Sequence, residues 1–295
     1  MVSLIFSILC SAAVVHLLKF ASRHTRAPFV VFASNYLTAG VLGIAVSGFK
    51  EITSQPPASW GLAALLGVLY VAGFAVFAKA IPRSGTAVSA SVSRISVVVP
   101  IVASVAFFAE SVSAIQIFGV VLAVLALPFA APAPPWRWKK RAAGGGQSGL
   151  RDVSREAPAS GLVWPLLLFF VVGLSDVGLK VRVELFPTSD PGWFFGMMFA
   201  TACVICLVVA LISGRPPSVK GVAIGVLLGT VNFGTAFFLS AALEQLAGFR
   251  VYTLNSIGVI IVAAIMGIVL WREWPGRNNY IFLSASIVAI VLLSG

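Results

Sequence analysis

Residues 85–110 read GTAVSASVSRISVVVPIVASVAFFAE, and residues 248–273 read GFRVYTLNSIGVIIVAAIMGIVLWRE. A constant offset of 163 residues aligns the two stretches without a gap, from Gly85 on Gly248 to Glu110 on Glu273. Between these ends Val88 meets Val251, Ser93 meets Ser256 and Val99 meets Val262. Each stretch is a long apolar segment that closes on a glutamate, in a chain with few charges. We therefore interpret the chain as one unit written twice.

The composition is that of a membrane protein. Of the 295 residues 59% are hydrophobic and 10% charged, whereas a soluble domain carries about 25% charged residues. The mean hydropathy is +1.04. These values exclude a water-soluble enzyme, a nucleic-acid-binding protein, a disulfide scaffold and a disordered chain. The net charge of +11 is best interpreted as membrane topology charge.

The sequence offers no catalytic, metal or cofactor motif. Cys203 and Cys206 form a C-x-x-C, but the flanking residues are almost wholly apolar, which disfavours a thiolate. Two histidines form no H-E-x-x-H, and no G-x-x-x-x-G-K-[ST] phosphate loop occurs. We therefore expect no enzyme activity, no metal and no cofactor.

Ten segments are long and apolar enough to span a bilayer, which requires about 20 such residues. The first lacks a cleavage site and is predicted to be a retained helix. The ten expected spans are 2–20, 28–48, 59–79, 84–108, 112–131, 162–182, 192–212, 219–242, 248–271 and 277–294.

The ten spans divide into two repeats of five. Lys19 closes the first span as Lys180 lies near the end of the sixth, and Ser-Gly pairs end the second and the seventh. Because five is odd, the second repeat enters the membrane from the opposite face, as in many secondary transporters. The predicted units are 1–131, a basic Pro- and Gly-rich linker at 132–161, and 162–295.

The pattern resembles the ten-helix EamA-like members of the drug/metabolite transporter superfamily. The resemblance is carried by Pro100–Ser104, Phe108–Ser111 and Gln116–Gly119, and by Ser256–Val259, Gly267, Trp271–Trp274 and Asn278. Ala263 and Phe282 depart from the first half, which has Pro100 and Gly119 there. The resemblance implies a central cavity lined by helices 1, 3, 4, 6, 8 and 9, alternating access, and transport of a small metabolite.

The basic residues predict the orientation. Of 20 lysines and arginines, 15 lie in the odd-numbered connections between spans and 4 in the even-numbered ones. The positive-inside rule then places the central 132–161 loop in the cytoplasm and both termini outside the cell membrane. The resemblance favours the opposite arrangement, with both termini inside.

Arg94 is the sharpest site candidate, because it lies about ten residues into an apolar span, where a charge is costly. We interpret it, with Ser91, as binding the carboxylate or phosphate of a substrate. A permanent ion pair with Asp176 and the capping of main-chain carbonyls at a helix break remain alternatives.

Two charged pairs lie one helical turn apart. Asp176 and Lys180, spaced i,i+4, either carry a coupling proton or form an intrahelical ion pair, which we favour slightly. His16 and Lys19 form a similar i,i+3 pair, in which a hydrogen-bonded histidine is the simpler interpretation. Glu110 and Glu273 are interpreted as helix-terminal anchors.

Polar and aromatic residues complete the expected substrate set. Asn232, Asn255 and Ser256 lie on expected cavity helices, where ligand contact and helix–helix hydrogen bonds are both plausible uses. Asn35 is expected to be structural. Tyr70 and Phe74 share a helix face that serves as a cavity wall or as packing.

The sequence thus predicts a secondary-active transporter, more specifically an exporter, of a small polar metabolite such as an amino acid or organic anion. Its partners would be that metabolite, membrane lipids and protons as coupling ion, and it would act as a monomer or homodimer. A proton-coupled multidrug or organic-cation exporter is the first alternative. A non-transporting scaffold or lipid scramblase is the second.

Overall fold

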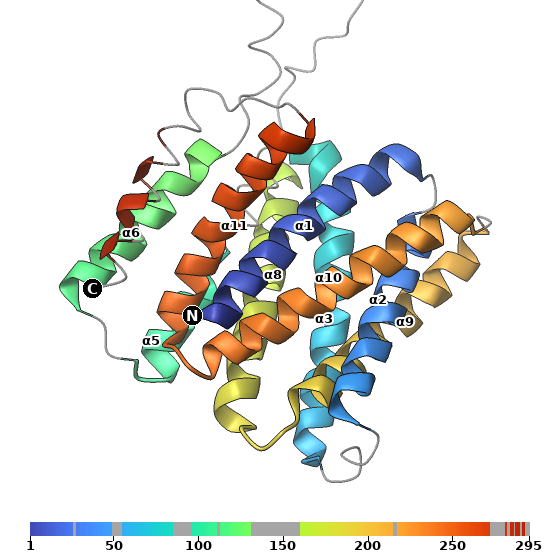
Figure 1. Cartoon of the computed structure of the whole chain (residues 1–295), viewed down its shortest axis with the longest axis horizontal. Coiled ribbons are helices and arrows are strands. Elements are labelled where there is room, and N and C mark those ends of the chain that lie inside the picture. The colour runs from blue at the N-terminus through green and yellow to red at the C-terminus, as the bar shows by residue number, and fades with distance from the viewer. Residues whose placement is uncertain are drawn as a thin grey trace, which may run out of the picture.

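The computed structural model describes residues 1–25, 28–48, 55–84, 96–110, 113–130, 160–214, 217–271 and parts of 281–292. Within these ranges the elements are α-helices (Figure 1). They are α1 (Val2–His24), α2 (Pro28–Ser47), α3 (Pro57–Ser84), α5 (Val98–Phe107), α6 (Ala114–Ala130), α8 (Ser160–Leu185), α9 (Pro191–Ile212), α10 (Val219–Leu243) and α11 (Gly248–Trp271).

Nine of the expected spans contain a described helix, and most bounds agree within a few residues. The span expected at 84–108 is described as a helix over Val98–Phe107, 10 residues. Local signals fix several starts: Asp190 and Ser218 accept hydrogen bonds from the first turns of α9 and α10, and Pro191 occupies the first position of α9. Five helices of the described chain are long and apolar enough to cross a membrane: α2, α3, α9, α10 and α11. The expected tenth span, 277–294, falls largely outside the described residues.

Helices of the first half pack mainly on helices of the second half. The contacts of α1 with α10 and α11 correspond to those of α8 with α3 and α5, and the contact of α2 with α10 corresponds to that of α9 with α3. The pairs α2–α9 and α5–α11 map onto themselves when the halves are exchanged. The two halves therefore interleave rather than forming separate bundles.

Glycines bring α2 and α9 into backbone contact. A Cβ added at Gly43 would lie 2.6 Å from the nitrogen of Gly196 and 2.7 Å from the oxygen of Gly192. A Cβ at Gly192 would in turn lie 2.8 Å from the oxygen of Gly43. Only glycine permits this approach, and small residues are the usual means of close helix packing in membranes.

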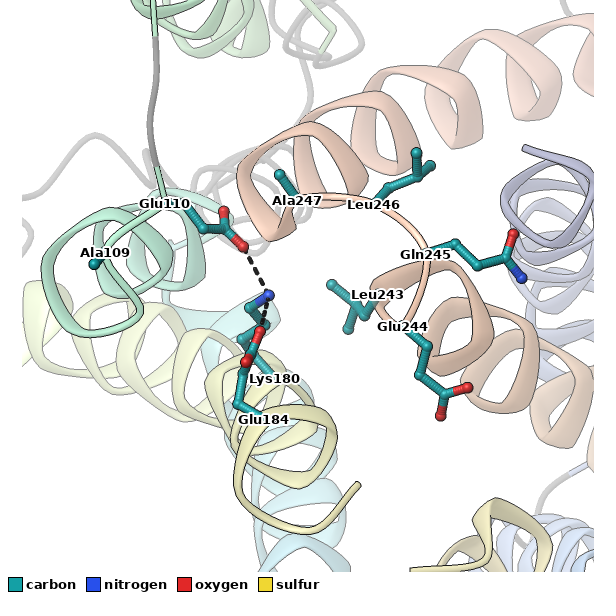
Figure 2. A pocket seen from close by; sticks show the side chains of 9 residues that line it. All are labelled: Ala109, Glu110, Lys180, Glu184, Leu243, Glu244, Gln245, Leu246 and Ala247. Atoms are coloured by element: carbon teal, nitrogen blue, oxygen red, sulfur yellow. Dashed lines mark ion pairs between the residues drawn. The ribbon is translucent and has the colours of Figure 1, made fainter. Parts of the chain in front are cut away.

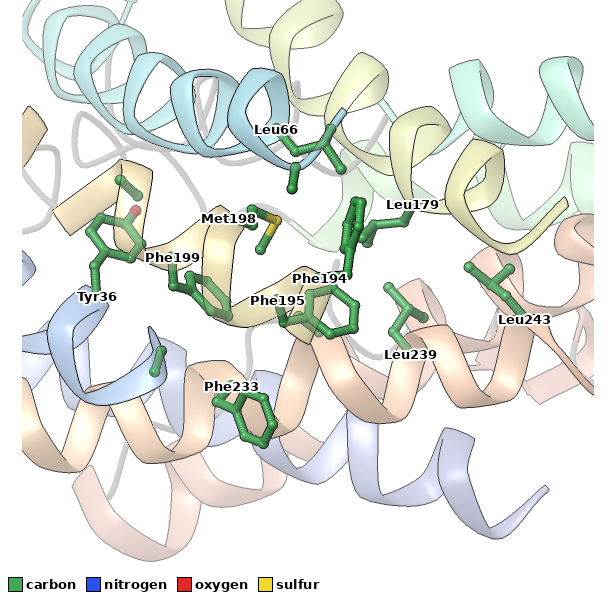
Figure 3. Packing of buried hydrophobic residues seen from close by; sticks show 14 of the residues in the cluster. Tyr36, Leu66, Leu179, Phe194, Phe195, Met198, Phe199, Phe233, Leu239 and Leu243 are labelled. Carbon is green, nitrogen blue, oxygen red and sulfur yellow. The ribbon is translucent and has the colours of Figure 1, made fainter. Parts of the chain in front are cut away.

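Aromatic side chains of α9 fill the core between the two halves (Figure 3). Phe194, Phe195 and Phe199 are fully buried and meet Tyr36 of α2, Leu66 of α3 and Leu179 of α8 in one cluster. Large apolar residues on the outer surfaces stay exposed, such as Leu37, Val41 and Val204. An apolar exterior over a packed core is the arrangement that lipid contact stabilises.

Candidate functional site

Helix α8 carries a stripe of charged residues that runs from its middle to its C-terminus. Asp176, Lys180 and Glu184 follow one another at intervals of four residues, so they share one face of the helix. Lys180 is buried, Asp176 is half-buried and Glu184 is exposed. The stripe therefore leads from the interior to the end of the bundle where α8 stops.

Lys180 binds two carboxylates at once. Its Nζ lies 2.7 Å from Oε1 of Glu110 and 2.7 Å from Oε1 of Glu184. The side chains of Lys180 and Glu110 are 3% and 11% exposed, whereas that of Glu184 is 41% exposed. A buried ammonium needs such partners, because an unpaired charge in an apolar interior is costly. The expected pair of Lys180 with Asp176 is wrong: within the described chain, Lys180 pairs with Glu110 and Glu184.

Glu110 also caps helix α11. Its Oε1 accepts a hydrogen bond of 2.6 Å from the backbone N–H of Gly248, and its Oε2 accepts one of 3.1 Å from that of Phe249. A carboxylate at a helix N-terminus satisfies free N–H groups and interacts favourably with the helix dipole. Glu110 is thus an anchor as predicted, but for a helix of the other half rather than for its own.

Two further features concern Glu110: the backbone conformation of the residue before it and the pKa of its carboxyl group. The preceding residue, Ala109, has a φ of +50°, the left-handed conformation that residues with a Cβ rarely adopt. Burial acts to raise the pKa of Glu110, but the hydrogen bonds from Lys180, Gly248 and Phe249 and the charge of Lys180 outweigh it and lower that pKa. Glu110 is therefore ionised at neutral pH.

Arg182 forms a second ionic cluster beside the first. Its Nη1 donates to Ser240 Oγ at 2.8 Å and to Glu244 Oε1 at 2.5 Å, and its Nη2 donates to the carbonyl oxygen of Ser189. Arg182 is 1% exposed, although the charge count treated it as a loop residue. It joins the end of α8 to the α8–α9 connection and to the end of α10.

A pocket of about 480 Å³ opens beside these ion pairs (Figure 2). Glu110 and Lys180 lie at its wall, and Glu184 and Glu244 reach into it from α8 and from the α10–α11 connection (Figure 2). We call this end of the molecule, marked by Glu110, Ser189 and Glu244, the even-loop side. The α8–α9 and α10–α11 connections on this side lie toward the bottom of Figure 1.

Deeper in the bundle, Tyr252 of α11 donates its hydroxyl to the main-chain oxygen of Asp176. Tyr70 of α3 packs edge-on against Phe199, at 6.1 Å between ring centroids. The Tyr252 hydrogen bond therefore joins α11 to the middle of α8, at the inner end of the charged stripe.

The other expected polar residues join helices of opposite halves. Asn232 donates to Asn35 Oδ1 at 3.3 Å, and Asn255 Oδ1 accepts from Ser7 at 3.3 Å. Nε2 of His16 lies at hydrogen-bond distance, 3.1 Å, from the main-chain oxygen of Ala263. A hydrogen-bonded histidine is the interpretation that we favoured. Ser256 is half-buried, and Phe74 packs on Phe32 at 3.9 Å between ring centroids.

Several predictions fall on residues that the structure does not describe. Arg94, Ser91 and Glu273 lie outside the described residues, as does the side chain of Lys19. Their assignments stay predictions from the sequence alone.

Sequence reasoning missed Arg182, Glu184 and Glu244 as members of a site. The only signal was local: Asp176, Lys180 and Glu184 recur every fourth residue, which marks a continuous polar face. Nothing local links Glu244 to Arg182, 62 residues earlier. That contact exists only because α8 and α10 end on the same side.

Comparison with known proteins gives a family match, a relative and a structural neighbour. Residues 1–130 match the EamA-like transporter family. An uncharacterized protein of Haemophilus influenzae is 29% identical over 305 residues, which cover 99% of this chain and 97% of that protein. A solved structure described only as a crystal structure of a protein has a TM-score of 0.76 at 14% identity, covering 99% of this chain and 94% of that one. That likeness concerns the fold alone.

Proposed function

We propose that this chain, whose residues 1–130 match the EamA-like transporter family, is a secondary-active exporter of a small polar metabolite. Amino acids and organic anions are the substrates that we favour. The family match carries the transporter class. The polar groups inside the bundle, above all Asp176 and the Tyr252 hydroxyl bonded to its main chain, support a polar substrate.

The proposed mechanism is alternating access between two inverted five-helix repeats, 1–131 and 162–295, joined by the linker 132–161. The correspondence of helix contacts on exchange of the halves supports it, because rocking of one repeat against the other needs equivalent interfaces. The chain has no nucleotide-binding motif, so a gradient of substrate or protons would drive transport.

We propose that substrate passes along the charged face of α8 between the interior and the even-loop side. Asp176 is the candidate for coupling protons, and Arg94 with Ser91 is the candidate for binding an anionic group. Asn232, Asn255 and Ser256 complete the proposed contacts.

The proposed orientation places the even-loop side outside the cell and the linker in the cytoplasm. Burial of Lys180 and Arg182 supports it, because neither is then a free loop charge. Of the four basic residues in even-numbered connections only Lys50 and Arg250 remain, which strengthens the positive-inside bias.

The test is counterflow in proteoliposomes, with a panel of amino acids, organic anions, phosphorylated metabolites and organic cations. Wild type, Arg94→Ala and Asp176→Asn are compared after each is shown to be folded in detergent. Ligands are first selected by thermal shift, where a ligand at 100 times its dissociation constant stabilises by about 2.7 kcal/mol.

We expect saturable flux of a zwitterion or anion that Arg94→Ala abolishes, and loss of pH-gradient coupling in Asp176→Asn. Flux of organic cations that Arg94→Ala leaves intact would replace this proposal with the multidrug alternative. Lipid movement without saturable solute flux would overturn transport altogether.

A further inference from the structure

Lys180 binds two glutamates that come from different halves of the molecule. Glu110 and Glu184 each place Oε1 at 2.7 Å from its Nζ. Glu184 lies on the same helix, one turn further on, so its ion pair is confined to α8. Glu110 follows α5 in the first half, so its ion pair crosses from one half of the molecule to the other.

Glu110 makes a further crossing contact through its hydrogen bonds to Gly248 and Phe249. One carboxylate therefore joins the first half to two helices of the second half, α8 and α11. By contrast, the pair between Arg182 and Glu244 lies wholly within the second half. Of these three ion pairs, that of Glu110 with Lys180 bridges the halves.

The contact is built so that it can be released. Glu110 and Lys180 line the open pocket of about 480 Å³, so water can solvate both charges once they separate (Figure 2). Ala109 holds the left-handed conformation while Glu110 is docked, and strain of this kind is characteristic of switch regions.

We propose that Glu110 is a latch on the even-loop side. It holds the two halves together there by binding Lys180 and the N-terminus of α11, and it lets go of both whenever the transporter opens on that side. The inference rests on the proposed alternating access and names the positioning residue that sets the balance between the two states. Glu110 contacts no substrate in this role.

The experiment compares Glu110→Gln with Glu184→Gln. Both variants remove one negative charge from Lys180, but only the first removes a contact between the halves. Hydrogen–deuterium exchange of the peptide that contains Gly248 and Phe249 reports the cap directly. A Ser104→Cys thiol, placed where the hydroxyl is fully buried beside Gly248, reports opening by its reaction with a membrane-impermeant reagent. Cys10, Cys203 and Cys206 are first replaced by alanine.

We expect Glu110→Gln to speed both amide exchange and thiol labelling by roughly tenfold, the effect of losing charge-assisted hydrogen bonds. Glu184→Gln should stay within about twofold of wild type, because an exposed pair within one helix contributes little. Glu110→Asp, which keeps the charge, should recover part of the difference. Melting temperatures of all variants establish that they are folded.

Equal acceleration in Glu110→Gln and Glu184→Gln would overturn the latch, since loss of charge at Lys180 would then suffice. Faster amide exchange without faster labelling would also overturn it and leave Glu110 as a static cap. Measurement of solute flux distinguishes the two proposals. If Glu110→Gln speeds exchange and labelling and Glu184→Gln does not, but wild type transports no solute, the contact between the halves is supported and transport is refuted.

Discussion

Two contacts between the halves of this molecule depend on different interactions: one on close backbone packing, the other on ion pairs and hydrogen bonds. At the α2–α9 crossing, Gly43 meets Gly192 and Gly196 backbone to backbone, with no room for a methyl group. On the even-loop side, Glu110 meets Lys180 and the first amides of α11 beside an open pocket. The packed glycines have no other contact to replace the one they lose, because separating the helices leaves a void. The ions and amides can exchange their partners for water.

The difference suggests a division of labour. The glycine crossing is suited to be the part about which the halves turn, since it forms a dry contact of fixed geometry. The ionic contact is suited to be broken and remade. Damage to the first should therefore affect stability, and damage to the second should affect mainly the balance between states.

The largest effect is expected from filling the glycine crossing. Gly43→Val would force side-chain atoms into the backbone of α9 and should cost more than about 3 kcal/mol of stability, at the upper end of overpacking. The matched control is Gly61→Ala on α3, where an added Cβ meets nothing within 4 Å. It should be neutral or stabilising by up to about 1 kcal/mol. Thermal unfolding in detergent measures both, and equal losses would refute the special role of the crossing.

Removal of Arg182 should have the next largest effect. Arg182→Met leaves Ser240, Glu244 and the oxygen of Ser189 without their shared donor. Because Glu244 is 43% exposed and can turn to water, we expect a loss of about 2–3 kcal/mol. Thermal unfolding measures it, with Lys220→Met as the control for removing an exposed charge. A loss below about 1 kcal/mol would show that the cluster is not structural.

Gly248→Ala should perturb the docking of Glu110 more mildly. The added methyl group would clash with Ser104 Oγ and lie 3.2 Å from Glu110 Oε1. We expect a cost of about 1–2 kcal/mol, again measured by thermal unfolding. The double variant Gly248→Ala, Ser104→Gly should recover most of this cost, since the hydroxyl lacks a hydrogen-bond partner and contributes little. If the double variant recovers no stability, the cost of Gly248→Ala does not come from the clash with Ser104.

The smallest effect is a pH dependence of Glu110. Its pKa is lowered from the ordinary 4.5 in the docked state, so the released or unfolded state binds a proton more readily. The stabilisation is therefore complete above that ordinary value and is lost as the pH falls through the lowered one. The positive Lys180 faces Glu110 from α8, and Glu184 and Glu244 line the same pocket.

Melting curves of wild type and Glu110→Gln at pH values from about 7 to 3 should converge only at the acidic end. A constant gap between the two curves throughout this range would show that Glu110 is not ionised when docked. Convergence already near neutral pH would instead make it a titrating group under physiological conditions.

The helices could be predicted because their signals are local. The apolar run from 192 to 212 begins after Asp190-Pro191, and the helix begins at Pro191. The start of α11 at Gly248 was predicted from the repeat and found there. The end of α8 was missed by three residues, because Arg182 was counted as a loop charge although the helix continues to Leu185.

The candidate site was predictable only in its parts. Lys180 and Asp176 were recognised because charge is scarce in an apolar helix, and Glu110 because it recurs at a fixed offset. Their partners were not, since Lys180 has a carboxylate four residues before it and another four residues after it. The choice of Glu184 and Glu110 over Asp176 depends on the direction of the lysine chain and on the position of the α5–α6 connection.

The sequence by itself determined that the chain is an apolar, multi-pass helical protein, because the patterns of hydropathy and charge are properties of order along the chain. Tertiary structure alone decided that the two halves interleave, that glycines of α2 and α9 touch, and that Glu110 binds Lys180 and caps α11. The physical reason is that ion pairs and backbone contacts depend on distance in space. Residues 70 positions apart along the chain can lie 2.7 Å apart in the fold.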